Sequence, residues 1–144
     1  MNKLLSFVLG EYGNKGKKYQ AFAGMRGNWC GMLIYFCCYH VIYIPAILSC
    51  SKCPRLSFPE KFQVAREWLK IGRIVFKPKM GDLVVFWRES LFSWKGHVGI
   101  FIKEDEADSN YIWVLGGNQY FLGFRIVCIK KYKKSEVLGY RRVE

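Results

Sequence analysis

The sequence predicts an α+β domain in which N-terminal helices pack on a C-terminal antiparallel β-sheet. Three observations support this prediction. The 144 residues suit one domain, 1–144, with a single hydrophobic core. Apolar runs of helical length fill the first half, and short runs rich in β-branched and aromatic residues fill the second half. Helices followed by a series of adjacent strands are typical of α+β domains.

Three helices are expected in the first half. The first covers residues 2–11. The apolar run 30–42 is too long for one strand, and Asn28 or Trp29 stands at its N-cap, so it is expected to form a buried helix. A proline begins the third helix, 59–71, and a glycine follows it. The glycine-rich segments between these helices are predicted loops, at 13–18 and 24–28.

Five strands are expected in the second half. Each is a short apolar or alternating run, and turn residues separate the runs. The predicted strands are residues 82–87, 97–102, 111–115, 124–129 and a short last strand at 139–142.

The formal net charge is +12, from 23 lysines and arginines against 11 acidic residues. Such a charge favours an anionic partner, such as nucleic acid, a lipid surface or a cell-wall polymer, although solubility alone could also explain it. The basic residues do not form a stripe interleaved with aromatics, so no nucleic-acid partner is predicted. No apolar run approaches the roughly 20 residues of a membrane helix, so no membrane insertion is expected. The short apolar N-terminus lacks a cleavage site, which predicts synthesis without a classical signal peptide.

Six cysteines are present, but their spacing is not that of a disulfide framework. Cys50 and Cys53 form a CxxC pair, which could complete a zinc site with a cysteine or histidine of the preceding helix, or could form a local disulfide. Neither would carry the chemistry, and no catalytic metal or cofactor is predicted. Three cysteines lie in apolar elements and are expected to pack as small hydrophobes: Cys37, Cys38 and Cys128.

Three residues form the candidate catalytic set, in the order Cys30, His97, Asn118. Cys30 begins the buried helix, where unpaired N–H groups and the helix dipole favour a thiolate and can hold an oxyanion. His97 begins a strand between glycines and can act as a base, and Asn118 follows a Gly-Gly turn and can fix the tautomer of that base. Each residue also has a plain structural interpretation: a core cysteine, a strand-end histidine and a turn asparagine.

Three further residues are predicted to contact substrate. Trp29 adjoins Cys30 and is expected in the cleft, Tyr12 is a candidate oxyanion donor, and Gly117 precedes Asn118 in the turn. Trp87, Trp94 and Trp113 could also line a substrate groove, but packing in the core of the sheet is the favoured interpretation.

Several segments together resemble the CHAP-like branch of the NlpC/P60 superfamily, a group of bacterial and phage cell-wall cysteine hydrolases. The resemblance covers residues 7–142 and implies a papain-like fold and hydrolysis of an amide bond in peptidoglycan. It also implies that Cys30 is the nucleophile, His97 the base and Asn118 the orienting residue. The segments that carry it are residues 65–70, 80–88, 94–100, 115–119 and 137–142.

The chain departs from the family pattern at three places. Gly31 and Met32 replace the usual small residue and aromatic after the nucleophile, and Gly116 stands where some members have a glutamate. The segment 49–59 is interpreted as an insertion of open role.

The expected function is therefore that of a peptidoglycan amidase or endopeptidase. The protein would be a monomer made in the cytoplasm that acts at the cell wall or periplasm of a target cell. It would serve either as a secreted antibacterial effector toxin, paired with an immunity protein, or as a phage-type lysin. The alternative is a catalytically inactive cell-wall-binding or protein-binding module that retains the fold.

Overall fold

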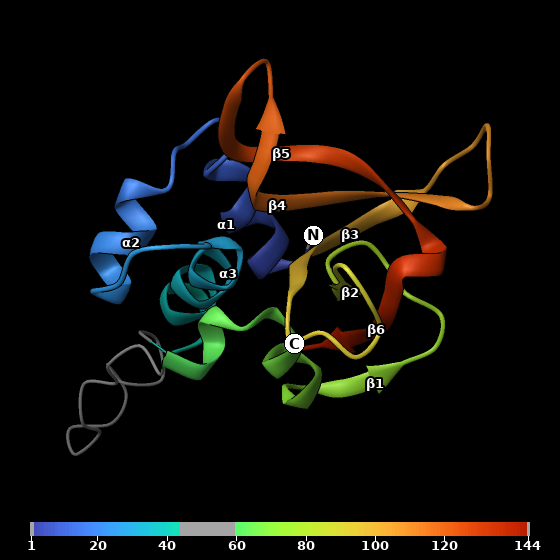
Figure 1. Ribbon diagram of the computed structural model, residues 1–144, viewed down its shortest axis with the longest axis horizontal. Helices are drawn as coiled ribbons and strands as arrows, with labels where there is room; N and C mark the ends of the chain where they lie inside the picture. Colours follow the sequence, from blue (N-terminus) through green and yellow to red (C-terminus); the bar gives the residue numbers. More distant parts are fainter. Residues whose placement is uncertain (1, 44–59, 144) are drawn as a thin grey trace.

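The computed structural model describes residues 2–43 and 60–143 of this chain and has an α+β fold (Figure 1). Its helical elements precede most of the strands, as the sequence predicts. The helices are α1 (Lys3–Gly10), α2 (Lys17–Ala23) and α3 (Cys30–Cys38), then the π-helical turn η1 (Tyr39–Tyr43), and the 3₁₀ turns η2 (Glu60–Gln63), η3 (Ala65–Lys70) and η4 (Lys134–Glu136). The strands are β1 (Arg73–Val75), β2 (Leu83–Trp87), β3 (Gly96–Glu104), β4 (Tyr111–Phe121), β5 (Phe124–Lys133) and β6 (Val137–Arg142).

The six strands form one antiparallel sheet in the order β1-β6-β2-β3-β4-β5. All five predicted strands are present. The sequence missed β1, which is only three residues long and pairs with β6 at the edge of the sheet. Strands β4 and β5 extend beyond their predicted ends to form a long hairpin. The apolar patterns of β1 and of the extended ends of β4 and β5 are too short or too mixed to predict strands. These segments form strands because a neighbouring strand hydrogen-bonds their backbone N–H and C=O groups.

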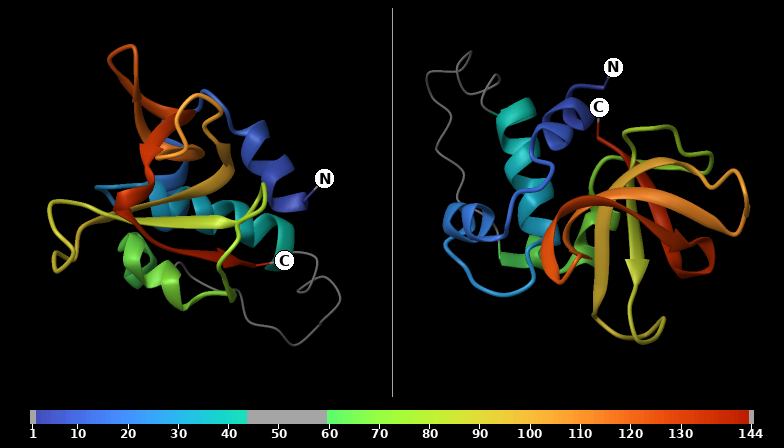
Figure 2. Two further views of the ribbon diagram at one scale, coloured as in Figure 1. Left: turned by 90° about the vertical axis from the view of Figure 1, so that its right-hand side faces the viewer. Right: turned by 90° about the horizontal axis from the view of Figure 1, so that it is seen from above.

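The helices lie on one side of the sheet, with α3 innermost (Figure 2). Every residue of α3 is buried, because α1, α2, the sheet and the η2–η3 segment all contact it. Asn2 caps the N-terminus of α1, since its Oδ1 accepts a hydrogen bond from the backbone N–H of Leu5 at 2.8 Å. No helix among the described residues is long and apolar enough to cross a membrane.

One predicted loop and one predicted helix differ from the structure. The predicted loop 13–18 contains the start of α2, a short helix held by the buried side chain of Tyr19. The predicted helix 59–71 is instead two 3₁₀ turns in its described part, separated at Val64. In both places tertiary contacts override weak local preference.

The sheet separates two clusters of buried side chains. One lies between the sheet and the helices and includes Leu33 of α3 with Val98 and Leu115. The other lies on the opposite face of the sheet and includes Phe86 and Val114. Strand alternation sends side chains of β3 to the two faces in turn, so the positions next to Val98 belong to the second face.

Candidate active site

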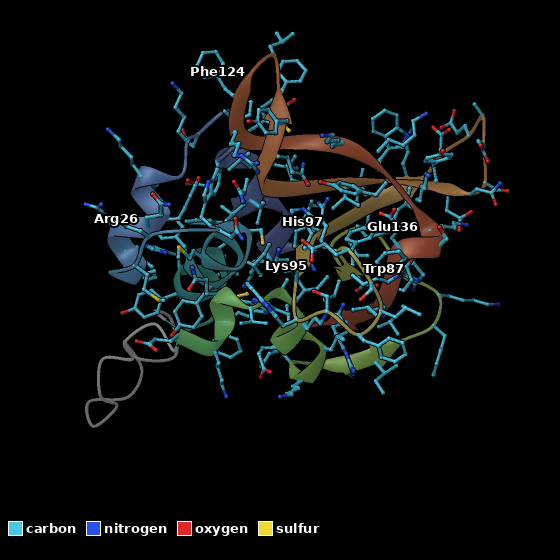
Figure 3. All side chains as sticks on the ribbon, in the orientation of Figure 1. Arg26, Trp87, Lys95, His97, Phe124 and Glu136 are labelled. Atoms are coloured by element: carbon cyan, nitrogen blue, oxygen red, sulfur yellow. The ribbon has the colours of Figure 1, made fainter. Side chains whose placement is uncertain are left out.

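A pocket of about 330 Å³ lies between the start of α3, the η2–η3 segment, the β2–β3 loop and the middle of β4. Cys30 and His97 both line it, although they are 67 residues apart in the sequence. Figure 3 shows His97 near the centre of the molecule, close to Lys95 of the β2–β3 loop. The fold thus brings the predicted nucleophile and the predicted base to one cavity.

Cys30 is the first residue of α3 and is 3% exposed. Gly31 follows it because the chain leaves no room for a side chain there: a Cβ would overlap the carbonyl oxygen of Phe62. The indole N–H of Trp68 donates to that same oxygen at 3.1 Å. The departure from the family pattern at Gly31 therefore has a packing cause, which is the close approach of η2 to the first turn of α3.

Burial raises the pKa of the Cys30 thiol. The backbone N–H groups of Val98 and Gly31 and the positive charge of Arg88 act in the opposite direction but do not outweigh burial. The thiol is therefore protonated at rest, and a base must accept its proton when it attacks.

Gln119 holds the ring of His97. Its Oε1 lies 2.9 Å from His97 Nε2 and accepts the hydroxyl hydrogen of Tyr132 at 3.0 Å. Its Nε2 donates to the carbonyl oxygen of Cys128 at 2.6 Å, which fixes the orientation of the amide. Because Oε1 can only accept, Nε2 of His97 must carry the proton. The free lone pair is then on Nδ1, and this atom is the one available as a base.

Burial lowers the pKa of His97 to about 3, and the positive charge of Arg88 adds to this effect. The ring lies between aromatic neighbours, with its centroid 5.3 Å from that of Tyr132 and 6.1 Å from that of Phe86. Together with the raised pKa of Cys30, this makes the resting pair a neutral thiol and a neutral imidazole rather than an ion pair.

The neutral state of His97 predicts a specific acid sensitivity. An unfolded histidine has a pKa near 6.5, so below that pH the unfolded chain binds one proton more than the folded chain. The stabilisation from the neutral ring is therefore complete above pH 6.5. It is lost as the pH falls towards 3, by up to about 1.4 kcal/mol per pH unit. Urea unfolding at pH 7.5 and 4.5 should show that the wild type loses about 2–3 kcal/mol more than His97→Gln. Equal losses in both proteins would contradict a neutral, buried His97.

Asn118, the predicted orienting residue, does not hold His97. Its Nδ2 donates to Oδ1 of Asn28 at 3.3 Å, and it lies at the rim of the pocket. The cause is a β-bulge in β4: Gly116 pairs with Cys128, but Gln119 pairs with Ile126. The bulge adds one residue to β4, and Asn118 adopts a left-handed conformation with φ of 58°. Regular alternation from Gly116 would place residue 118 on the His97 face, and the bulge places Gln119 there instead.

The structure places the three predicted substrate contacts outside this pocket. Trp29 is 5% exposed and stacks on Tyr19, with centroids 5.3 Å apart, in the core behind Cys30. Gly117 packs against the Trp29 ring, where a Cβ would clash. Tyr12 is exposed in the turn after α1. None of the three lines the pocket. Trp29 was expected in the cleft because it precedes Cys30 in the sequence. Successive residues at a helix start point in different directions, so the Trp29 ring lies in the core while Cys30 lines the pocket.

Several pocket residues were missed by the sequence interpretation. Trp94 was assigned to the core but is 65% exposed and lines the pocket, as do Arg88 and Arg125. Two amide residues, Asn118 and Gln119, follow Gly116-Gly117 in the sequence. Either could have been the residue that orients His97, and the sequence pattern does not distinguish them. Gly116 itself leaves no room for a glutamate, because a Cβ there would lie 2.7 Å from Oε1 of Gln119.

The cysteines expected in the core are there: Cys37, Cys38 and Cys128 are buried. Cys50 and Cys53 fall outside the described residues, as does the whole segment 49–59. Within residues 2–43 and 60–143, no group of three or more histidine, cysteine or acidic side chains could hold a metal ion.

Comparison with known proteins gave no match to a family model and none to a curated protein. The assignment to the CHAP-like branch therefore stays a prediction carried by the motifs.

Proposed function

We propose that this chain is a cysteine hydrolase of papain-like fold that cuts an amide bond in peptidoglycan. The observation that carries the proposal is the convergence of Cys30 and His97 on one pocket, with the His97 tautomer fixed by Gln119. A nucleophile, a base and a group that orients the base are the parts that thiol hydrolysis needs.

The chemistry follows from the resting states of the two groups. Sγ of Cys30 attacks the substrate carbonyl carbon while its proton passes to Nδ1 of His97. Backbone N–H groups at the start of α3, those of Cys30 and Gly31, are suited to receive the oxyanion. The imidazolium then protonates the leaving amine, and a thioester remains on Cys30. Water hydrolyses the thioester, with His97 again acting as the base.

Transfer of the proton during attack suits the site better than a preformed ion pair. Burial disfavours the charged forms of both Cys30 and His97. The charge on the imidazolium is then transient, and Oε1 of Gln119, which accepts Nε2–H, stabilises it.

Mass spectrometry of peptidoglycan digests tests the proposal. The wild type should release new fragments whose masses identify the bond, and Cys30→Ala should release none. Cys37→Ala is the matched control, because it removes a buried cysteine from the same helix and should leave the fragments unchanged. Sacculi of several chemotypes should be used, since groove shape selects the bond.

Intact sacculi after treatment with every variant would reject the hydrolase. The alternative, an inactive module that retains the fold, would then stand, and co-sedimentation of the wild type with sacculi would separate wall binding from protein binding. The net charge of +12 suits the anionic envelope under either function.

A further inference from the structure

The pocket around Cys30 carries an excess of positive charge. Among the described residues that line it, Arg88, Lys95 and Arg125 are cationic and Glu89 alone is acidic. Lys95 and Glu89 form an ion pair with each other. Within the described part of the chain, neither Arg88 nor Arg125 has a carboxylate partner. Both arginines are exposed, and like charges that line one cavity give it a positive potential that attracts anions.

Aromatic rings hold both guanidinium groups in place. The Cζ atom of Arg88 lies 5.6 Å from the centroid of Tyr132, and that of Arg125 lies 4.5 Å from the centroid of Tyr120. Stacking of this kind orients the plane of a guanidinium. Arg88 also hydrogen-bonds the side chain of Tyr132, and its five N–H groups leave further donors for an anion. Nη1 of Arg125 makes two long contacts, at 3.5 Å and 3.4 Å, to the carbonyl and side-chain oxygens of Asn118.

Arg88 is also close to the reacting groups. Tyr132, on which it stacks, donates to the Gln119 oxygen that holds His97. The charge of Arg88 also lowers the pKa of both Cys30 and His97. An anion bound at Arg88 would therefore lie beside the scissile bond rather than at a remote part of the surface.

We propose that Arg88 and Arg125 form a carboxylate-binding subsite, which selects amide substrates that carry a free carboxylate next to the bond to be cut. Planar guanidinium groups bind carboxylates through paired N–H donors, and such charge-assisted bonds are stronger than neutral ones. This inference rests on the proposed function for the identity of the substrate, but the subsite itself can be tested without any hydrolysis.

The test compares the alkylation of Cys30 by iodoacetate and by iodoacetamide. The two reagents transfer a similar group to the thiol with loss of iodide and differ in charge. Rate constants are measured separately for each cysteine by peptide mass spectrometry. The ratio of the iodoacetate rate to the iodoacetamide rate cancels differences in the reactivity of the thiol, including those caused by loss of the Arg88 charge.

The ratio at Cys30 should be at least about tenfold higher in the wild type than in the double variant Arg88→Gln/Arg125→Gln. Arg88→Lys keeps the charge but loses the planar fork and should fall between them. Arg26→Gln is the matched control, since Arg26 lies away from His97 at the edge of the molecule (Figure 3), and it should keep the wild-type ratio. Equal ratios in the wild type and the double variant, or an equal fall in Arg26→Gln, would overturn the subsite.

Should the buried thiol resist both reagents, amide NMR of the wild type replaces alkylation. Acetate should shift the signals of the pocket residues Gly96 and Asn118 in a saturable way, acetamide should not, and the double variant should respond to neither. Absence of a response to acetate in the wild type would overturn the subsite. A preference for the anion without peptidoglycan fragments would keep the subsite and reject the proposed function. Release of peptidoglycan fragments without a preference for the anion would keep the proposed function and reject the subsite.

Discussion

Gln119→Ala is expected to lower kcat/KM for amide hydrolysis by about 10²–10³-fold. Without the acceptor oxygen, His97 is no longer held with its proton on Nε2, and the fraction of molecules with a free lone pair on Nδ1 falls. The measurement is steady-state release of the amine product from a soluble peptidoglycan fragment. Most of the loss should be in kcat, because Gln119 is buried behind the ring and does not line the pocket.

Two further variants separate this role from general damage. Gln119→Glu keeps an acceptor for Nε2–H and should retain more activity than Gln119→Ala. Its carboxylate also favours the imidazolium, so the pKa of His97 should rise in this variant and the acid limb of the pH–rate profile should move to higher pH. Asn118→Ala removes the neighbouring amide without touching His97 and should cost less than Gln119→Ala. The reverse order of the two alanine variants would assign the orienting role to Asn118.

Glu11→Ala is expected to lower the free energy of unfolding by about 3 kcal/mol. Oε2 of Glu11 accepts the hydroxyl hydrogen of Tyr19 at 2.7 Å, and bonds from Lys18 and Asn14 complete the site. Burial on its own raises the pKa of this carboxyl group, but the hydrogen bonds outweigh it, so the pKa of Glu11 is lowered. Removal of the Glu11 carboxylate leaves the hydroxyl of Tyr19, a fully buried residue, without this acceptor.

Urea unfolding of a double-mutant cycle measures this effect. Tyr19→Phe should cost much less in the Glu11→Ala background than in the wild type, because the hydroxyl it removes has already lost its partner. Glu67→Ala is the control, since its ion pair with Lys70 is largely exposed on the lysine side, and it should cost less than about 1 kcal/mol. Additive effects in the cycle would show that Glu11 and Tyr19 are not coupled. Tyr19 stacks on Trp29, so this network also supports the start of α3 at Cys30.

The class of the fold and the positions of Cys30 and His97 at the starts of their elements could be predicted from local pattern. The run 30–42 is apolar on all sides of a helix and so predicts a buried helix. Cys30 is the first residue of this run, so its position at the helix start does not depend on how the helix packs. His97 stands at a strand start that glycine and the following apolar run define. Such features depend on residues near each other in the chain, which is why one sequence is enough to find them.

Other features depended on tertiary contacts that the local sequence pattern does not indicate. The sequence of α2 has little helical pattern of its own. The helix is stabilised by Tyr19, which donates a hydrogen bond to Glu11 and stacks on Trp29. Gly31 is required by the Phe62 carbonyl, which no pattern around position 31 indicates.

Local sequence pattern was enough to establish the α+β class, the buried helix and the placement of Cys30 and His97 at the starts of their elements. The tertiary structure alone decided which amide orients His97, because a one-residue bulge in β4 exchanges the faces of Asn118 and Gln119. It also decided that Trp29 belongs to the core and that Arg88 and Arg125 meet at the pocket. Local periodicity specifies an element and its exposed and buried faces, but strand register and side-chain contacts are set by partners that lie far away in the chain.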